Sequence, residues 1–434
     1  MLYFIGIKGT GMAALAAMMA DIGEEVTGSD LSKHFFTEDE LVARGITILP
    51  FDPANIKDNY TVIIGNAFLE DFSEVVAARR NPTCKCYRYH EFLGELMKKY
   101  RSISICGSHG KTTTTTMAKT VFKAFGPTAY LIGDGEGYLR KDSEYLCVES
   151  CEFRRHFLAY YPEYAIITNI EIDHVDYFKD EQDYFAAYQS FVGNVGKAVF
   201  YYGDDPWCRQ LKFGDLENYS FGFDSRNDYY LEVLKRDPEH SRIALYFKET
   251  LLGEYDLPFV GDHQLIDALG VIALAHHLGF DLSKAIAALN DFKGPKRRYV
   301  IEKHGDSVFI DDYAHHPTEV KVTLQATRQR YPDKKIVAVF KPHRASRVLY
   351  FADEFAQALK LADKIYLLDF TSIDDKQDGT DIDITYLSAK IAGSQVISED
   401  AKGAAAIAAN GSAVYVFMSS KDIYNIANMV KEGI

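Results

Sequence analysis

The sequence predicts an α/β protein of three domains, each built on a mostly parallel sheet. Short apolar runs alternate with helical stretches along the chain, which is typical of parallel strands buried on both faces. Two of these runs lead into glycine turns that open a helix. The length of 434 residues suggests about three domains at roughly 150 residues each.

The first segment, residues 1–99, is predicted to form an N-terminal Rossmann-like domain. It opens with an apolar strand at 2–5, and an Ala- and Met-rich helix follows to about Asp21. A second strand precedes Ser29 and Asp30, and a third, at 61–64, ends before Asn66. Alternation of this kind favours a doubly wound sheet with its ligand at the strand ends.

A glycine loop follows the first strand, in the order Gly6-x-x-Gly9-x-Gly11. The usual dinucleotide fingerprint is Gly-x-Gly-x-x-Gly, so this order counts against a nicotinamide cofactor. An acid after the second strand, here Asp30, often meets a ribose hydroxyl in such folds. We therefore expect a nucleotide diphosphate at this loop, with a purely structural turn as the alternative.

A second glycine loop opens the central segment, residues 100–296, which is predicted to be a phosphate-loop domain with a parallel sheet. The strand at 103–106 enters this loop, and Lys111 starts a helix. Tight glycine turns aim N–H groups at a polyphosphate, the lysine adds charge, and a threonine hydroxyl can reach Mg²⁺. The sequence therefore predicts ATP binding by Gly107, Ser108, His109, Gly110, Lys111, Thr112 and Thr113. The alternative is a turn whose lysine is only solvated.

Two further strands of the central segment lead to side chains that can bind a metal. The strand at 145–148 ends at Glu149, and His174 follows the strand at 164–168. Ligands collect at the carboxyl ends of parallel strands, where the phosphate loop also lies. We therefore expect Thr112, Glu149 and His174 around the Mg²⁺ of the nucleotide.

The third segment, residues 297–434, is predicted to be a second Rossmann-like domain. An apolar helix at about 265–278 ends the central segment, and Gly294-Pro295 with a basic triplet marks the boundary. Polar residues follow the predicted strands at 308–310 and 336–340. Arg298 in the triplet is placed to neutralise a transferring phosphoryl group, although such triplets are usually solvated hinges.

Composition restricts the function classes. The formal net charge of −14 argues against nonspecific binding to nucleic acid or to an anionic membrane. Six cysteines without a C-x-x-C pair indicate reduced cytoplasmic thiols. We find no secretory signal and no apolar stretch for a bilayer, so we expect a cytoplasmic protein without membrane insertion. The oligomeric state stays open.

These blocks, in this order, resemble the bacterial Mur ligase family over nearly the whole chain. The most specific markers are the stretches at 6–12, 109–113, 169–174 and 311–319. The resemblance implies an N-terminal UDP-sugar domain, a central ATPase and a C-terminal amino-acid domain. It also implies that ATP, UDP-N-acetylmuramate and L-alanine give an amide, ADP and phosphate through an acyl phosphate, in peptidoglycan precursor synthesis.

The resemblance further implies roles for residues that match the family's motifs. The UDP-sugar would meet Gly6, Lys8, Gly9, Thr10, Gly11, Ser29, Asp30 and Asn66. Beyond the phosphate loop, ATP would meet His263, Gln264, Arg298 and Asp312. L-Alanine would meet Tyr313, His343, Arg344 and Arg347, and the catalytic residues would be Lys111, His174 and Arg298.

Two departures from the family pattern keep alternatives open. Gln264 stands where asparagine is usual, and Ser419-Ser420-Lys421 replaces a glycine-containing loop. The alternatives are a ligase of altered amino-acid or peptide specificity, a non-catalytic ATP-binding relative, and a nicotinamide-dependent dehydrogenase. No residue can be named as the base for the incoming amine.

Overall fold

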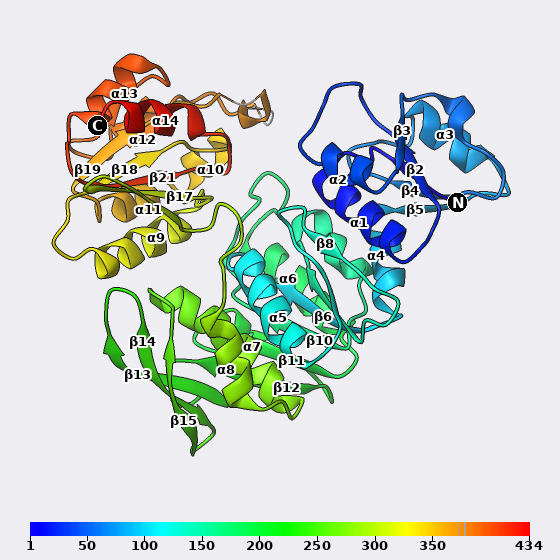
Figure 1. Cartoon of the computed structure of the whole chain (residues 1–434), viewed down its shortest axis with the longest axis horizontal. Helices are drawn as coiled ribbons and strands as arrows, with labels where there is room; N and C mark the ends of the chain where they lie inside the picture. Colours follow the sequence, from blue (N-terminus) through cyan, green and yellow to red (C-terminus); the bar gives the residue numbers. More distant parts are fainter. Residues whose placement is uncertain (372, 377–378) are drawn as a thin grey trace. The chain divides into compact units, whose positions relative to one another are not determined.

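The computed structural model describes residues 1–371, 373–376 and 379–434 (Figure 1). The chain folds into two compact units, neither of which is continuous in sequence. Unit 1 consists of Met1–Ile170, Phe185–Tyr230 and Asp267–Phe292. Unit 2 consists of Glu171–Tyr184, Leu231–Ile266 and Lys293–Ile434.

The N-terminal part of unit 1 is a five-stranded parallel sheet in the order β3-β2-β1-β4-β5. Its strands are β1 (Leu2–Ile5), β2 (Val26–Ser29), β3 (Thr47–Leu49), β4 (Thr61–Ile64) and β5 (Lys85–Arg88). Its helices are α1 (Thr10–Asp21), α2 (Glu38–Ala43), α3 (Ser73–Arg80) and α4 (Tyr89–Met97). The strand order reverses direction at β1, so the loop after β1 lies where such sheets bind ligands.

Helix α1 is buried along its whole middle, from Met12 to Met19. Small Ala side chains let other backbone approach it, and Gly137 of β8 (Gly137–Tyr138) lies against Ala14 and Met18. A helix that is apolar on all sides is stable only when it is covered on all sides. The burial of α1 therefore fixes the position of its N-terminus and of the loop that precedes it.

The central part of unit 1 carries strands in the order β12-β11-β10-β6-β9-β7-β8. They are β6 (Arg101–Cys106), β7 (Thr128–Leu131), β8, β9 (Tyr145–Glu149), β10 (Tyr164–Ile167), β11 (Ala198–Tyr202) and β12 (Glu217–Gly222). Helix α5 (Lys111–Phe125) packs on β6, β7 and β9, and α8 (Leu282–Asn290) packs on α5 (Figure 1). The carboxyl ends of β6, β9 and β10 thus meet at one edge.

Three elements have residues in both units. They are α6 (Glu181–Val192), β13 (Tyr229–Arg236) and α7 (Asp262–His277). Helix α7 begins at Asp262, so Asp262, His263 and Gln264 are its first turn, whereas the sequence predicts a helix only from about 265.

Unit 2 contains a six-stranded sheet in the order β16-β17-β21-β18-β19-β20, parallel except for β16. Its strands are β16 (Val300–His304), β17 (Ser307–Asp312), β18 (Ile336–Phe340), β19 (Lys364–Leu367), β20 (Gln395–Val396) and β21 (Val414–Met418). Its helices are α9 (Pro317–Arg330), α10 (Ala345–Tyr350), α11 (Ala352–Leu359), α12 (Thr385–Ser388), α13 (Ala401–Ala408) and α14 (Tyr424–Glu432). The hairpin β14 (Ser241–Phe247) and β15 (Thr250–Leu257) also belongs to unit 2.

The predicted α/β class and the strands at 2–5, 61–64, 103–106 and 336–340 are confirmed. Strand β17 is longer than predicted and includes Asp311 and Asp312, because the ladder to β21 continues through both residues.

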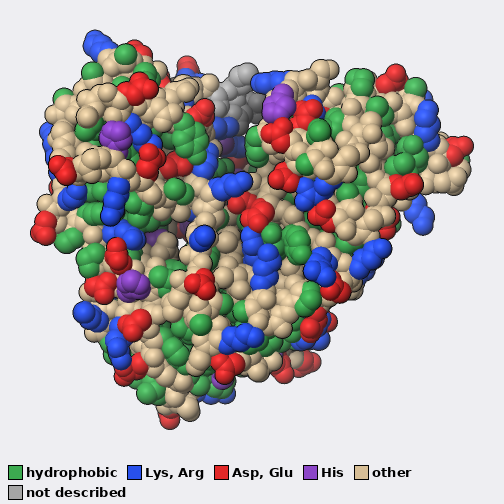
Figure 2. Space-filling view, in the orientation of Figure 1, with side chains coloured by type: hydrophobic (Ala, Val, Ile, Leu, Met, Phe, Trp, Pro, Cys, Tyr) green, Lys and Arg blue, Asp and Glu red, His purple; other side chains and the backbone are tan. Residues whose placement is uncertain are grey.

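No helix of the described residues has the length and apolar character that crossing a bilayer requires. All six cysteines are free thiols, and basic and acidic side chains lie interspersed on the face shown in Figure 2.

Candidate active site

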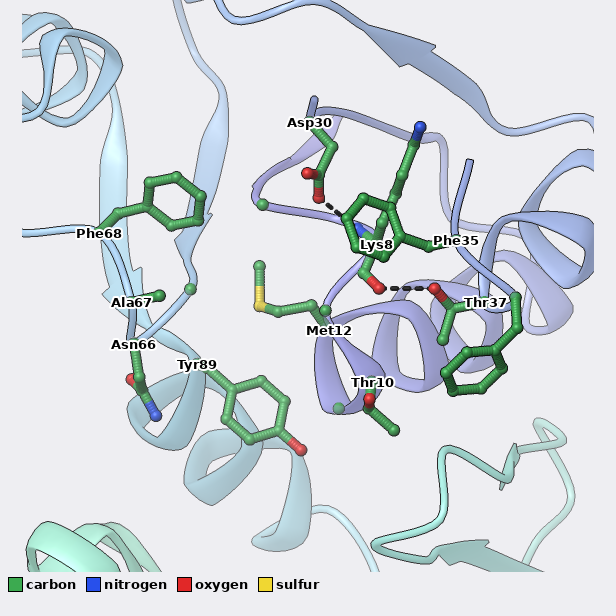
Figure 3. Close-up of a pocket in the computed structure, with 15 residues that line it drawn as sticks. Lys8, Thr10, Met12, Asp30, Phe35, Thr37, Asn66, Ala67, Phe68 and Tyr89 are labelled. Atoms are coloured by element: carbon green, nitrogen blue, oxygen red, sulfur yellow. Dashed lines mark hydrogen bonds between the residues drawn. The ribbon is translucent and has the colours of Figure 1, made fainter. Parts of the chain in front are cut away.

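The loop after β1 forms one wall of a cavity of about 530 Å³ in the N-terminal part of unit 1 (Figure 3). Of the predicted UDP-sugar residues, all but Ser29 line it. The lining consists of Gly6, Lys8, Gly9, Thr10, Gly11, Met12, Asp30, Phe35, Phe36, Thr37, Gly65, Asn66, Ala67, Phe68 and Tyr89. The cavity therefore combines backbone N–H groups at the start of α1 with an apolar, aromatic wall.

Glycine is required at two positions of this loop for different reasons. Gly6 has a φ of +79°, and a Cβ there would overlap the ring of Phe68. Gly11 has ordinary helical backbone, but a Cβ there would lie 2.8 Å from the phenol oxygen of Tyr89. The first glycine permits the turn, and the second makes room for a side chain of another element.

Lys8 is buried and serves the protein's own backbone. Its amide donates to Asp30 Oδ2 at 2.7 Å, and its ammonium donates to the carbonyls of Leu31 (2.8 Å) and Lys33 (3.0 Å). The same ammonium forms an ion pair with Glu38 at 2.8 Å. Lys8 therefore holds the segment between β2 and α2 against the glycine loop.

Ser29 and Asn66 differ in where their side chains lie. The Ser29 hydroxyl donates to the fully buried Glu74 at 2.5 Å, inside the domain rather than in the cavity. Asn66 lines the cavity and bonds two histidines, His90 Nδ1 at 3.1 Å and His156 Nδ1 at 3.3 Å. The two imidazole rings are stacked, with centroids 4.4 Å apart.

The phosphate loop after β6 is held by the end of β10. The Ser108 amide donates to the carbonyl of Asn169 (3.1 Å), and the His109 amide donates to its side-chain oxygen (2.9 Å). Gly110 has a φ of +81°, and a Cβ there would lie 2.6 Å from Asp267. The sequence predicts that these amides face a phosphate, but Asn169 accepts two of them. The N–H groups of the first turn of α5 remain as phosphate donors.

Lys111 is the first residue of α5 and its ammonium lies back over the loop. It donates to the carbonyls of Gly107 (2.6 Å) and Ser108 (3.0 Å) and pairs with Glu152 Oε2 at 3.0 Å. Glu152 is completely buried. Burial alone would lower the pKa of Lys111, but the surrounding acidic groups, Glu152 first among them, together outweigh burial and raise that pKa. Lys111 therefore stays charged although most of its side chain is out of contact with solvent.

Thr112 and Glu149 lie together, as the sequence predicts. The Thr112 hydroxyl donates to Glu149 Oε1 at 3.0 Å, and Glu149 Oε2 accepts from the Gly133 amide at 2.7 Å. A hydroxyl and a carboxylate oxygen next to a phosphate loop are the oxygen ligands that Mg²⁺ prefers. The donor set of these two residues therefore fits the ion.

In unit 2, Arg298 lies between an aromatic ring and a carboxylate. Its guanidinium is 4.7 Å from the centroid of Tyr313 and 3.3 Å from Glu319 Oε1. The neighbouring Asp312 accepts from the amides of Ala314 (2.8 Å) and Tyr299 (3.1 Å). Burial raises the pKa of Asp312 to about 6, with Arg298 opposing the shift.

The arginines predicted to bind L-alanine are paired with acids of the segment Glu171–Tyr184, also in unit 2. Arg347 is buried and donates from Nε (3.0 Å) and Nη2 (2.7 Å) to Asp173 Oδ1. Arg344 is more accessible and pairs with Asp176. His174 belongs to this segment, with a φ of +52°, and His343 accepts from Arg347 Nη1 through its carbonyl at 3.3 Å.

His263 and Gln264, in the first turn of α7, also belong to unit 2. Burial lowers the pKa of His263 to about 4, so its ring is neutral at pH 7. Gln264 Oε1 accepts from the Val260 amide at 3.3 Å, a bond that the extra methylene of glutamine allows. The structure thus gives the glutamine a role in the turn before α7.

Unit 1 brings Lys111, Thr112 and Glu149 together, and unit 2 brings Arg298, Asp312 and Tyr313 together. Sequence reasoning missed Glu152, although it belongs to the same acidic stretch as Glu149. It also missed Tyr89 and the aromatic wall of the cavity, for which no local pattern gives a signal.

Three family models match successive segments of the chain. The Mur ligase family catalytic domain matches residues 1–101, the Mur ligase middle domain matches 105–275, and the Mur ligase glutamate ligase domain matches 296–429. Together they cover most of the 434 residues.

Individual relatives are similar over nearly the whole length. The UDP-N-acetylmuramate–L-alanine ligase of Lacticaseibacillus casei is 43% identical over 422 residues, which are 97% of this chain and 95% of that protein. The solved structure of MurC, a UDP-N-acetylmuramate–alanine ligase of Thermotoga maritima, has a TM-score of 0.78 at 26% identity, covering 99% and 98% of the two chains. A murein peptide ligase of Psychrobacter arcticus shares the fold, with a TM-score of 0.69 at 23% identity, covering 100% and 98%.

Proposed function

The chain belongs to the Mur ligase family, and we propose that it joins UDP-N-acetylmuramate to L-alanine at the expense of ATP, in peptidoglycan precursor synthesis. The likeness to the L. casei ligase over nearly both whole chains supports these substrates. The observation in the structure that carries the proposal is the partly buried Lys111 on a phosphate loop, beside the Thr112–Glu149 pair.

The chemistry explains why a ligase needs such a loop. A carboxylate is a poor electrophile, and transfer of the γ-phosphoryl group of ATP gives an acyl phosphate that an amine can attack. The two reactants are both anions, so positive charge and N–H donors must offset their repulsion. Lys111 supplies the charge, and the amides at the start of α5 supply the donors. Because loop carbonyls and Glu152 already hold the Lys111 ammonium over the loop, its charge is in place when phosphates arrive.

Mg²⁺ would be held by Thr112 and Glu149, with His174 as a third ligand. Bound there, the ion neutralises charge on the phosphates and orients them. The Gly133 amide donates to Glu149 and leaves the oxygen beside Thr112 for the ion.

The UDP-sugar would occupy the cavity beside the first glycine loop. Gly9, Thr10 and Gly11 present the start of α1 to the diphosphate, where helix N–H groups and the dipole favour an anion. Asp30 and Asn66 supply polar contacts, and Lys8 with Ser29 shapes the site. We place the UDP-sugar domain at residues 1–99, the ATP domain at 100–296 and the amino-acid domain at 297–434.

Beyond the phosphate loop, Arg298 would meet the phosphates of ATP, and His263, Gln264 and Asp312 would meet its nucleoside. Tyr313, His343 and Arg344 would form the L-alanine pocket. We assign the carboxylate clamp to Arg344, which is the more accessible of the two arginines. Arg347 would not contact the carboxylate of L-alanine and would act indirectly, by holding Asp173, the neighbour of His174. With ATP and a nucleotide sugar as its substrates, the enzyme would act in the cytoplasm.

One observation favours a second candidate, a ligase with a different amino-acid range. Arg297 donates to the carbonyls of Ser419 (2.8 Å) and Lys421 (2.9 Å), and the Ser419 hydroxyl accepts from the Lys421 amide (3.0 Å). The loop that lacks the family's glycines is therefore fixed by side chains. Glycine or L-serine would then replace L-alanine as the preferred substrate.

Phosphate release with UDP-N-acetylmuramate, Mg²⁺ and ATP, measured against a panel of amino acids, tests both candidates. We expect release to need all components and the amide with L-alanine to appear by mass spectrometry. Preference for another small amino acid supports the second candidate. Release without the sugar nucleotide, and no amide, contradicts both.

A further inference from the structure

We propose that Tyr89 is a substrate-contacting residue, which donates its phenolic hydrogen to a diphosphate oxygen of the bound sugar nucleotide. This inference rests on the proposed function of the N-terminal cavity and adds a ligand group that lies outside the glycine loop. The relevant observation is that a side chain from α4 reaches the start of α1.

Tyr89 is the first residue of α4 and lines the cavity. Figure 3 shows its hydroxyl directed toward the start of α1, beside Thr10. A Cβ built on Gly11 would lie 2.8 Å from that hydroxyl oxygen, so the phenol occupies the space that the glycine leaves. The hydroxyl thus lies next to the N–H groups that would bind the diphosphate.

Within the described residues, the Tyr89 hydroxyl has no hydrogen-bond partner. Its surroundings act on it only through burial and through nearby charges. Burial raises the pKa of Tyr89, and the neighbouring Cys151 and Glu149 add to the shift. The phenol therefore stays protonated over the whole working pH range and needs an acceptor. An anionic oxygen is the strongest acceptor that the cavity would receive.

The backbone that carries Tyr89 is held on both sides, so the phenol is placed precisely by its helix. Arg88 donates to the Phe68 carbonyl at 2.5 Å, and its amide donates to Glu91 at 2.7 Å. Gly94, one and a half turns on, lies so close to the Ala159 carbonyl that no Cβ would fit. Removal of the hydroxyl alone should leave this helix unmoved.

Tyr89→Phe in the full-length chain tests the inference, and Tyr87→Phe is the matched control. Tyr87 lies two residues away in β5, packs edge-on against Phe92 with centroids 5.9 Å apart, and does not line the cavity. Calorimetric titrations would use UDP-N-acetylmuramate and UDP, the latter as a probe that carries the diphosphate without the amino sugar.

We expect Tyr89→Phe to weaken binding of both ligands about tenfold, as loss of one charge-assisted hydrogen bond would. KM for the sugar nucleotide should rise by the same factor, with kcat and the affinity for ATP within twofold of the wild type and Tm unchanged. Tyr87→Phe should bind both ligands like the wild type.

Wild-type affinity of Tyr89→Phe for UDP would overturn this inference and leave the proposed function standing. Equal weakening in Tyr87→Phe would also overturn it, because the effect would then be structural. Failure of the wild type to bind either UDP-N-acetylmuramate or UDP would overturn both the inference and the proposed function.

Discussion

The two glycine loops of unit 1 have the same local design and use their lysines differently. Each loop follows a buried strand and opens a helix, and each contains one lysine, buried in the first loop and partly buried in the second. In the first loop, the Lys8 ammonium binds two carbonyls of a neighbouring segment and the partly accessible Glu38. In the second, the Lys111 ammonium binds carbonyls of its own loop and the fully buried Glu152.

The difference shows that the position of a lysine in a glycine loop does not define its role. Lys8 connects the loop to the segment before α2, and a ligand would gain little by displacing those bonds. Lys111 lies over the mouth of its loop, where phosphate oxygens can replace carbonyl oxygens as acceptors. We therefore expect substitution of Lys8 to act mainly on stability and substitution of Lys111 mainly on turnover.

The largest expected effect is that of Lys111→Ala. Turnover should fall by a hundredfold or more, which corresponds to a barrier raised by about 3 kcal/mol. The reason is that the variant loses the positive charge that offsets the negative charge of the transferring phosphoryl group. The structure adds an effect on stability, since Glu152 would be left buried without a counter-ion, and breaking such a pair costs roughly 3–5 kcal/mol. Steady-state kinetics and thermal unfolding measure the two effects.

The double variant Lys111→Ala/Glu152→Gln separates them. It should recover much of the lost Tm, because the uncompensated carboxylate is gone, and it should stay inactive. Near-normal turnover in either variant would contradict the role of Lys111.

Lys8→Met should have the next largest effect, and it should act on stability. The variant loses two hydrogen bonds and a partly buried ion pair, about 2 kcal/mol. KM for the sugar nucleotide should rise several-fold as the segment before α2 loosens, while kcat at saturation is kept. An unchanged Tm with abolished sugar-nucleotide binding would instead make Lys8 a direct ligand.

Two glycines of the first loop provide a smaller and more specific comparison. Gly11→Ala should lower Tm by a few degrees, because its Cβ would press on the Tyr89 phenol. Gly9→Ala should leave Tm unchanged, since its nearest neighbour would be the Gly6 carbonyl at 3.4 Å, an ordinary contact. Both should raise KM for the sugar nucleotide and spare ATP. An equal fall in Tm in the two variants would contradict this difference, because it would show that a Cβ is accommodated equally badly at both positions.

The smallest expected effect concerns the Asn66–His90–His156 cluster, which connects the first cavity to the segment carrying Glu152. Burial lowers the pKa of His156 to about 4, with His90 adding to the shift. The unfolded chain therefore binds more protons between about pH 4 and 6.5, so stability falls as pH falls through that window. The protonation of His156 accounts for about 1 kcal/mol of this loss of stability, after allowance for the partial exposure of its side chain. Tm measured at pH 7.5 and 5.5 should drop less in His156→Gln, and parallel curves would contradict this.

The sequence predicted those parts of the site that depend on local patterns. Strand, glycine turn and helix follow one another along the chain, so the loops at Gly6–Gly11 and Gly107–Thr112 were predictable, as was the meeting of Thr112 with Glu149 at one sheet edge. The partners that come from distant segments were not. Tyr89, Glu152 and Asn169 reach the loops through packing, and no spacing rule relates them to a glycine.

The pairing of Arg347 with Asp173 is one instance of a wider property of the chain. The polypeptide passes between the two units five times, after residues 170, 184, 230, 266 and 292. Neither unit can be excised as one continuous fragment, and a cut after residue 184, 230 or 266 divides both units. The Arg347–Asp173 pair joins two of the three segments that make up unit 2. We accordingly expect the whole polypeptide to melt in one calorimetric transition, with no separable domain left behind.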